Sequence, residues 1–294
     1  MKSGNFITVL ITAFNRKNYI KQAINSVLHQ DLDGEKFEVI VLKNFRDAYI
    51  DQIIENNSLR CFTIDGSIGK YLYEGVINSN GEIISFLDDD DLFLPNKLSI
   101  IYREFKNNDL AYYHNNHIKI DEMGNIIETP FSLLNRPVDF NMSSISIRKS
   151  VLDINAIKSL QTAPDTATYI SALNSGMKIV DSKKILTYYR IHRANTAQGK
   201  NTQWKQLYLL QLKKLLEHYE GEEKIVQHLN KLIIFAKVSL IMDLNKEISN
   251  PDASYYIAHL IKNSNYETVF KFTKFLIGKK LLLHKQRRTS KLSL

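Results

Sequence analysis

The densest concentration of chemically active groups in the sequence is a run of four aspartates, Asp88 to Asp91. The run directly follows the apolar residues 83–87 and precedes a second apolar stretch that begins at Leu92. Two unit charges about 4 Å apart repel by roughly 1 kcal/mol even in water, so adjacent carboxylates require cationic partners, raised pKa values or a bound cation. Oxygen ligands suit hard divalent ions such as Mg²⁺ and Mn²⁺. The run therefore predicts a divalent metal site at the end of a buried strand.

Two alternating patterns in the first 90 residues indicate how this site is positioned. Nearly continuous apolar runs predict buried strands, and apolar residues at helical spacing predict helices. The predicted strands cover residues 6–11, 37–42, 60–64 and 83–87, and the predicted helices cover residues 19–30, 68–78 and a polar stretch between the second and third strands. Such alternation is typical of a mostly parallel, Rossmann-like α/β sheet, in which ligands bind outside the carboxyl ends of the strands. The aspartates and residues 12–16, which follow the first strand, are therefore expected to be neighbours.

The rest of the chain contains mixed elements and then helices only. Strands are predicted over residues 111–120, 143–147 and 185–191, with a turn at 121–125 and a helix over residues 164–173. Beyond Asn201, the spacing of apolar residues predicts helices over residues 204–219, 222–244 and 255–283. We therefore predict an α/β domain over residues 1–199 and a helical C-terminal domain with a basic tail over residues 200–294.

Composition and charge narrow the class of protein. The single cysteine, Cys61, excludes a disulfide within the chain and a thiolate metal cluster. The net charge of +8 is concentrated near the C-terminus, where lysines interleave with apolar residues. Such an end can lie on an anionic membrane surface, or it can pack on the protein with a disordered basic tip.

The sequence also favours a particular location. No signal peptide is visible, and no uninterrupted apolar run reaches the roughly 18 residues of a membrane span. We therefore expect a cytoplasmic protein with a peripheral contact at the inner face of the membrane. Nucleic-acid binding is not favoured, because the positive charge is confined to one end and no recognition motif accompanies it.

Three segments together resemble the family 2 glycosyltransferases of GT-A fold. They are residues 11–16, Ile-Thr-Ala-Phe-Asn-Arg, residues 80–91, from Asn-Gly-Glu to the four aspartates, and residues 189–192, Tyr-Arg-Ile-His, with Asn195 beyond them. The resemblance covers residues 5–196. It implies a GT-A fold and the transfer of a sugar from a nucleotide-sugar donor, with inversion at the anomeric carbon and dependence on Mn²⁺ or Mg²⁺.

Under this resemblance, the four aspartates have different roles. Asp90 is expected to contact the metal, and Asp88 and Asp89 to contact the donor ribose and diphosphate. Asp91 is expected to orient its neighbours. A cation at this point would stabilise the charge that a leaving nucleoside diphosphate gains as the glycosidic bond breaks. The structural alternative is an acidic loop or helix cap without a ligand.

Two later segments are expected to complete the reaction site. His192 and Arg190 resemble a loop that closes over the donor diphosphate, with His192 also reaching the metal. Asp165 resembles the general base of the family, although a proline, Pro164, stands where the family usually has a second acid. A carboxylate at a helix start can accept the proton of an acceptor hydroxyl, and it can equally cap its own helix.

The ends of the first three strands are expected to bind the nucleoside and phosphates of the donor. By resemblance, the donor-binding residues there are Thr12, Phe14, Asn15, Arg16, Asn44, Asp65 and Lys70. Two departures from the family pattern concern the same region. Lys43 and Asn44 follow the second strand where the family typically has acids, and Leu72 and Tyr73 stand where many members have an Arg-Asn pair.

Ser143 and Ser144 lie in the segment that faces the acceptor in similar proteins, although serines there can also point outward from an edge strand. The sequence thus predicts an inverting, metal-dependent glycosyltransferase, with a UDP-sugar favoured as donor. The expected acceptor is a hydroxyl of a saccharide or of a lipid-linked, cell-surface molecule. A non-catalytic binding module of the same fold and a nucleotidyltransferase stay as alternatives, the second disfavoured because residues 12–16 contain no glycine.

Overall fold

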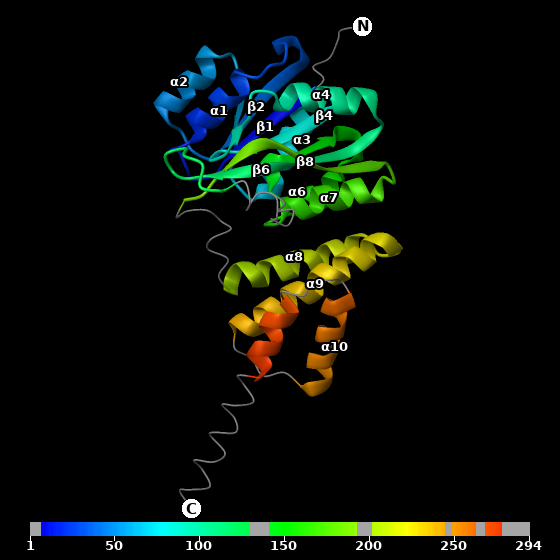
Figure 1. The fold of residues 1–294 in the computed structure, drawn as a ribbon. Helices are drawn as coiled ribbons and strands as arrows, with labels where there is room; N and C mark the ends of the chain where they lie inside the picture. The colour runs from blue at the N-terminus through cyan, green and yellow to red at the C-terminus, as the bar shows by residue number, and fades with distance from the viewer. Residues whose placement is uncertain (1–6, 130–140, 193–201, 245–248, 263–267, 278–294) are drawn as a thin grey trace, which may run out of the picture. The chain divides into compact units, whose positions relative to one another are not determined.

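A computed structural model describes residues 7–129, 141–192, 202–244, 249–262 and 268–277, and divides the chain into two compact units, Met1–Gln198 and Gly199–Leu294 (Figure 1). The first unit contains an eight-stranded sheet. In order across the sheet, the strands are β3 (Arg60–Thr63), β2 (Phe37–Lys43), β1 (Ile7–Ala13), β4 (Ile83–Asp88), β7 (Ile145–Arg148), β6 (Leu110–Ile120), β8 (Lys178–Arg190) and β5 (Leu92–Phe93). The first four strands in this order are parallel, as are β6 and β8, whereas β7 and β5 are antiparallel to their neighbours. The predicted α/β, mostly parallel GT-A-like sheet is confirmed.

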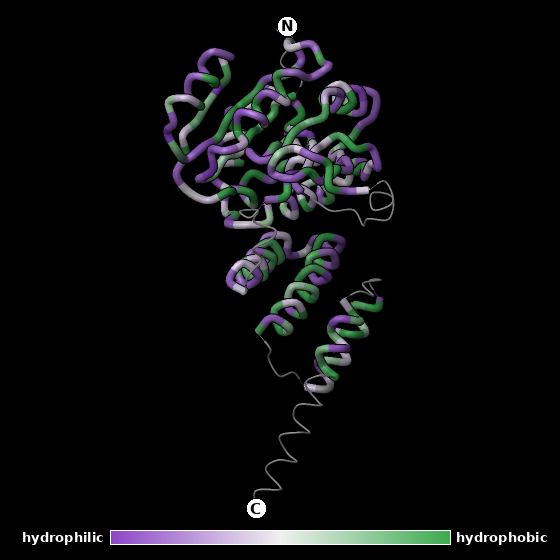
Figure 2. The backbone as a smooth tube through the Cα atoms, turned by 60° about the vertical axis from the view of Figure 1, so that its left-hand side comes forward, coloured by the Kyte–Doolittle hydropathy of each residue, from purple (hydrophilic) through white to green (hydrophobic). Residues whose placement is uncertain are grey.

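Helices cover both faces of this sheet (Figure 1). The helices on one face are α1 (Ile20–Leu28), α2 (Ala48–Asn56) and α4 (Lys97–Asn107), and those on the other are α3 (Ile68–Asn78), α6 (Ile154–Lys158) and α7 (Pro164–Asn174). In β1, Ile7, Val9 and Ile11 enter one apolar cluster with residues of α1, α2 and α4. Alternate residues of a strand point to opposite faces, so Leu10 packs instead towards Gly75 of α3. Hydrophobic stretches accordingly run through the interior of this unit (green in Figure 2).

The carboxyl ends of the central strands lie at one edge of the sheet. Thr12 of β1 pairs with Asp88 of β4, and Ala13 of β1 pairs with Lys43 of β2. The loop after β1 and the aspartates after β4 are therefore neighbours, as the sequence predicted.

Gly81, in the Asn-Gly-Glu segment, permits a close approach between the start of β4 and β1. Its backbone N–H donates to Oγ1 of Thr8 at 2.9 Å. A Cβ at this position would lie 2.5 Å from the backbone nitrogen of Thr8, which real side chains essentially never do. The glycine thus sets the register in which β4 delivers the aspartates to the far edge.

Two predicted strands differ from the structure. Residues 143–147 were expected as one strand, but Met142–Ser144 form a short 3-10 helix and β7 begins only at Ile145. β7 is also an internal strand between β4 and β6, so the alternative that the serines point outward from an edge strand is wrong. β8 begins at Lys178, ahead of the predicted start at residue 185. The sequence did not predict its first residues as strand because they are mostly polar and half-exposed and therefore lack an apolar pattern.

The second unit is helical in its described part, as predicted. Its helices are α8 (Thr202–His218), α9 (Glu223–Asp243), α10 (Asn250–Lys262) and a stretch over residues 268–277. Leu229, Ile234 and Val238 of α9 are buried. Among the described residues, α9 is the one helix long and apolar enough to cross a membrane by length and composition, and a third of that stretch is buried. The last 17 residues, with most of the basic tail, lie outside the described residues.

Candidate functional site

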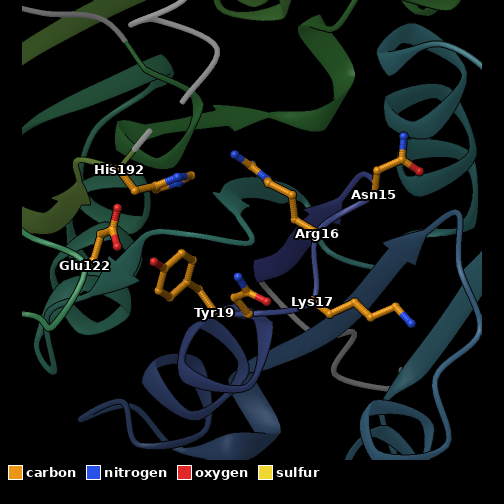
Figure 3. A pocket seen from close by; sticks show the side chains of 7 residues that line it. Asn15, Arg16, Lys17, Tyr19, Glu122 and His192 are labelled. Carbon is orange, nitrogen blue, oxygen red and sulfur yellow. The ribbon is translucent and has the colours of Figure 1, made fainter. Parts of the chain in front are cut away.

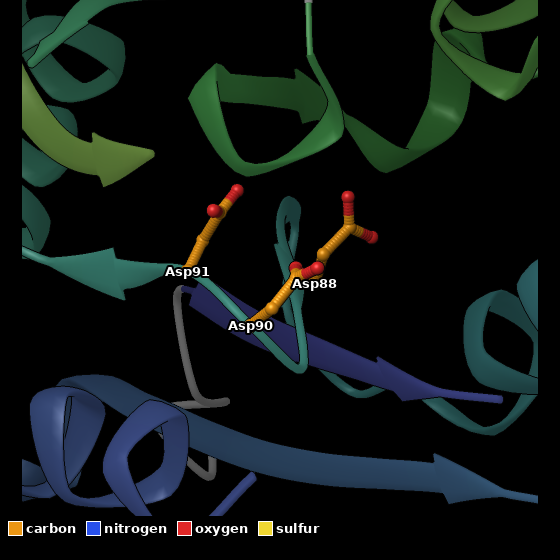
Figure 4. Close-up of side chains that lie close together, drawn as sticks. All are labelled: Asp88, Asp90 and Asp91. Atoms are coloured by element: carbon orange, nitrogen blue, oxygen red, sulfur yellow. The ribbon is translucent and has the colours of Figure 1, made fainter. Parts of the chain in front are cut away.

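Three of the four aspartates bring carboxylate oxygens together at the turn between β4 and β5 (Figure 4). One oxygen each of Asp88, Asp90 and Asp91 lies within 4.8 Å of the other two. The backbone fixes the turn, because the N–H of Asp91 donates to the carbonyl of Asp88 at 3.2 Å, and the N–H of Asp89 donates to the carbonyl of Thr12 at 3.1 Å. The spacing is close to that of oxygen ligands around a single hard cation.

Burial of this turn makes its carboxylates costly to ionise. Burial, and then the Asp90 carboxylate, raises the pKa of Asp88 to about 6, although Arg16 and Thr12 act in the opposite direction. Burial likewise raises the pKa of Asp89 to about 7 and outweighs the effect of Arg16. Closely spaced carboxylates in such a setting bind protons or a cation.

Asp91 has the most enclosed carboxylate of the four. Its Oδ1 accepts a hydrogen bond from the backbone N–H of Arg190 at 2.9 Å, whereas Oδ2 is buried and has no hydrogen bond of normal geometry among the described residues. Burial, and then Asp90 and Asp88, raises the pKa of Asp91 well above its usual value. An acceptor atom left over in this position suits a cation, so Asp91 joins the candidate metal ligands, which the sequence had not predicted.

The side chains of Arg16 and His192 contact the carboxylates of this turn. The guanidinium of Arg16 forms ion pairs with Asp89 and Asp90, the second at 2.7 Å, and Nε2 of His192 lies 2.9 Å from Oδ2 of Asp90. Burial lowers the pKa of Arg16, but Asp90 and Asp89 outweigh it and raise the pKa above its ordinary value. The two predicted metal-binding residues, Asp90 and His192, are thus in direct contact.

A pocket of about 420 Å³ opens beside these groups (Figure 3). It is lined by Asn15, Arg16, Lys17, Asn18, Tyr19, Glu122 and His192. The side chains of Arg16 and His192 point toward one another across it, and that of Lys17 points away. The pocket can therefore receive an anionic group in contact with Arg16.

Asp165 lies near the acidic turn, in the first turn of α7. Its carboxylate is one of the charges that raise the pKa of Asp88, and its Oδ1 accepts from the N–H of Thr166 at 2.8 Å. The N-cap residue is Ala163, which has no side-chain cap and a left-handed φ of 57°. Asp165 is therefore not the N-cap residue, although its carboxylate accepts from one N–H of the first turn of α7. The strained backbone before it is a feature that often marks functional sites.

Most of the predicted nucleoside contacts gather at the ends of β1, β2 and β3. Asn15 and Asn44 form a reciprocal pair, in which the N–H of Asn15 donates to Oδ1 of Asn44 and Nδ2 of Asn44 donates to Oδ1 of Asn15, both at 2.8 Å. Asn15 has a left-handed φ of 56°. Lys70 donates to the carbonyl of Asp65 at 2.7 Å.

Two further residues of this edge were also expected at the donor. The ring of Phe14 is 52% exposed and meets Tyr71 edge to face, so it offers an apolar surface at the strand ends. Thr12 donates from Oγ1 to Oδ1 of Asp88 at 3.1 Å.

Three predicted site residues have internal roles instead. Arg190 ends β8 rather than lying in a loop, and its fully buried guanidinium donates to protein oxygens, which corrects its expected place at the donor diphosphate. Ser143 and Ser144 are fully buried, so neither faces an acceptor. Ser143 instead accepts a hydrogen bond from the N–H of Asp88 at 3.0 Å and supports the acidic turn. Asn195, in the third segment of the resemblance, lies outside the described residues.

Sequence reasoning missed several residues around the pocket. Glu122 and Tyr19 line it, yet Glu122 belongs to a predicted turn and Tyr19 to the start of a predicted helix. Lys97 is fully buried behind the acidic turn, where it donates to the carbonyl of Ser143 at 2.5 Å and to Oγ1 of Thr187 at 3.1 Å. The available signal for this last role was a lysine in a largely apolar stretch, residues 97–102.

Comparisons with known proteins agree with this geometry. Residues 8–149 match the family described as glycosyl transferase family 2. An uncharacterised glycosyltransferase of Rickettsia bellii is 31% identical over 134 residues, which cover 42% of this chain and 18% of that protein. The match thus spans about a fifth of the length of the relatives from Rickettsia bellii and Rickettsia conorii. The Escherichia coli UDP-Glc:alpha-D-GlcNAc-diphosphoundecaprenol beta-1,3-glucosyltransferase WfaP is 23% identical over 205 residues. This match covers 66% of this chain and 80% of WfaP.

Solved structures share the fold at low sequence identity. Residues 1–349 of S. aureus TarS, crystallised with UDP-GlcNAc, align with a TM-score of 0.59 at 18% identity, over 87% of this chain and 79% of that one. The mannosyltransferase PcManGT from Pyrobaculum calidifontis, in complex with GDP-Man and Mn²⁺, aligns with a TM-score of 0.58 at 13% identity, over 95% of this chain and 86% of that one. Residues 8–149 of the chain thus match glycosyl transferase family 2, and the structure shares the fold of these solved proteins.

Proposed function

We propose that the protein transfers a sugar, with inversion at the anomeric carbon, from a nucleotide-sugar donor to a hydroxyl of a saccharide or lipid-linked acceptor. The observation that supports this most is the cluster of Asp88, Asp90 and Asp91 oxygens beside a pocket that also presents Arg16. A UDP-sugar is the favoured donor, because TarS was crystallised with UDP-GlcNAc and the name of WfaP specifies UDP-Glc.

A divalent cation, Mn²⁺ or Mg²⁺, fits the residues of the acidic turn. Asp90 and His192 would hold it with an oxygen of Asp91, because Oδ2 of Asp91 is buried and has no hydrogen bond of normal geometry among the described residues. When bound, the cation would neutralise charge on the donor diphosphate, and PcManGT was solved with Mn²⁺. Arg16 and the pocket beside it would orient the same diphosphate.

Asp165 is the proposed general base. Its carboxylate would accept the proton of the acceptor hydroxyl while the hydroxyl oxygen forms a bond to the anomeric carbon. The bond from that carbon to the diphosphate breaks in the same step, and the nucleoside diphosphate leaves with the electron pair. Attack opposite the leaving group inverts the configuration.

The exposed ends of β1, β2 and β3 would bind the nucleoside. Phe14 offers a face for stacking, and the amides of Asn15 and Asn44 offer both donors and acceptors to a base edge. Asp65 and Lys70, joined by a hydrogen bond just after β3, would contact the ribose and phosphates. Thr12 and Asp88 would contribute to the same ribose site.

We also propose a peripheral contact with the anionic inner face of the membrane through the second unit. Residues 199–294 contain 17 of the 39 Lys and Arg residues but only 8 of the 31 Asp and Glu residues, so the positive charge of the chain resides there. Co-sedimentation with anionic vesicles, but not with neutral ones, is the expected behaviour.

Thermal stabilisation by nucleotides tests the proposed function against its alternatives. The melting temperature should rise with UDP only when Mn²⁺ or Mg²⁺ is present, and Asp90→Ala should remove this rise. A larger rise with a nucleoside triphosphate than with any diphosphate would favour a nucleotidyltransferase. No rise with any nucleotide would favour a binding module.

A further inference from the structure

The segments that surround the pocket converge on one buried side chain, that of Arg190. This residue ends β8 and has no exposed surface. Its backbone N–H donates to Oδ1 of Asp91, and its Nε donates to the backbone carbonyl of Asp90, both at 2.9 Å. Arg190 therefore contacts the acidic turn at two consecutive residues.

The rest of the guanidinium reaches two other segments that line the pocket. Nη1 donates to the carbonyl of Asp121 at 3.1 Å and to that of Glu122 at 2.9 Å. Nη2 donates to Oε1 of Gln22 in α1 at 2.6 Å, and the guanidinium lies 4.5 Å from the centre of the Tyr19 ring. The β6 turn and the start of α1 are thus connected to the acidic turn through one group.

We propose that Arg190 is a positioning residue for the metal and diphosphate site. It sets the places of the Asp90 backbone, of the Glu122 turn and of Tyr19, and it precedes His192 by two residues. It touches neither metal nor donor itself, because its guanidinium is buried among protein oxygens. The proposal rests on the proposed function, since it assumes that Asp90 and His192 bind a divalent cation.

The chemistry of the guanidinium accounts for this role. A planar fork with five N–H donors can satisfy several carbonyls in fixed directions, whereas the ammonium of lysine is a single point with three donors. Arg190→Lys would keep the positive charge and lose the fork. At least one buried carbonyl would then lack a partner, and the turn that presents Asp90 would shift.

Another arginine of the sheet provides a matched control. Arg148, at the end of β7, donates from Nε to the carbonyl of Leu110 at 3.0 Å, and thus also ties a strand to a backbone carbonyl. It pairs with Ile83 at the opposite edge of the sheet from Asp88. Arg148→Lys therefore makes the same chemical change away from the pocket.

The test is a calorimetric titration of the full chain with Mn²⁺ alone, together with the melting temperature of each variant. We expect Arg190→Lys to weaken Mn²⁺ binding tenfold or more, because replacing a residue that supports metal ligands typically has an effect of this size. Arg148→Lys should bind Mn²⁺ like the wild type, even if its melting temperature falls as much as that of Arg190→Lys. Should Arg190→Lys not fold, Gln22→Ala decides, because Gln22 is exposed and its loss removes one of the partners of the fork. It should weaken Mn²⁺ binding about threefold, a smaller loss than for the arginine.

Three results would overturn the proposal. The first is that Arg190→Lys binds Mn²⁺ like the wild type, or that Gln22→Ala does so where Arg190→Lys does not fold. The second is that Arg148→Lys loses as much Mn²⁺ affinity as Arg190→Lys. In these two cases the proposed metal site survives and only the role of Arg190 fails. If the wild type itself does not bind Mn²⁺, the metal dependence in the proposed function fails as well.

Discussion

At the scale of single residues, four chemically identical aspartates differ because their partners differ. Asp88 meets Thr12, Asp89 meets Arg16, Asp90 meets both Arg16 and His192, and Asp91 accepts from the backbone of Arg190. The sequence predicted that the run needs a cation. Which partner each aspartate contacts, however, depends on residues that are distant along the chain. The position of Oδ2 of Asp91, for instance, depends on β8, which begins some 90 residues later.

Replacing Asp165 tests the proposed base. Asp165→Asn keeps the size of the side chain but cannot accept the acceptor proton, so kcat should fall by about 10²- to 10⁴-fold. Binding of UDP with Mn²⁺ should stay within about twofold of the wild type, because the half-buried Asp165 lies outside the proposed nucleotide contacts. Steady-state kinetics and calorimetry measure the two effects.

Asp153 gives a matched control for this change. It caps the neighbouring helix α6 by accepting from the N–H of Ala156 at 2.9 Å. Asp153→Asn should keep full turnover, since asparagine also caps helices. Undiminished turnover in Asp165→Asn would exclude Asp165 as the base.

Replacing Arg16 should separate metal binding from nucleotide binding. Its guanidinium competes with a cation for the Asp90 carboxylate, from which it lies 2.7 Å away. Arg16→Gln should therefore strengthen the binding of Mn²⁺ alone by several-fold and weaken the binding of UDP in the presence of Mn²⁺ by about tenfold, the worth of one charge-assisted contact. Calorimetric titrations with each ligand measure both constants, and equal losses for the two ligands would contradict this assignment.

At the scale of elements, the sequence predicted the first half of the sheet well and its middle poorly. α3 covers the predicted residues 68–78, because a Ser67 N-cap and regular apolar spacing define it locally. The starts of β7 and β8 were misplaced. Both strands pair with β6, which is distant in sequence, and the mostly polar first residues of β8 hide its strand pattern. Glu122 was missed for the same reason, because the β6–β8 pairing brings its turn to the pocket.

Gly81 gives a test at this scale. In Gly81→Ala, the added Cβ would meet backbone of β1, which cannot move without breaking the pairing of β1 with β4. The free energy of unfolding should fall by about 1–3 kcal/mol or more, the usual cost of overpacking a core. Urea unfolding measures this loss. Gly34→Ala is the control, since nothing lies within 4 Å of its added Cβ, and a similar loss in both variants would refute the explanation.

At the scale of the whole molecule, the sequence predicted the division of chemistry and charge along the chain. The α/β unit contains the acidic turn, the pocket and Asp165, and the helical unit contains the surplus of positive charge. Strong local signals, a run of carboxylates after a strand and a lysine-rich end, made this possible. The surroundings of the pocket could not be predicted in the same way, because α1, the β6 turn and the end of β8 meet only in the folded unit.

The stability of the whole protein without metal should depend on pH through these carboxylates. The pKa of Asp89 is raised to about 7 in the folded state, so its contribution to stability is full below the unfolded pKa of about 4 and is lost as the pH rises towards 7. Between pH 5 and pH 8, the wild type should lose about 1 kcal/mol or more relative to Asp89→Asn. Urea unfolding without metal measures the difference, and an equal change in both proteins would contradict the role of Asp89.

The central claim, a metal-dependent nucleotide-sugar site on the acidic turn, is tested most directly by the release of UDP from a panel of UDP-sugars, with water as a slow acceptor. The wild type should release UDP from at least one of these donors with Mn²⁺ present. Release should stop on chelation of the metal and in Asp90→Ala. Release that continues at the wild-type rate in Asp90→Ala, or that is absent for every donor, would contradict the claim.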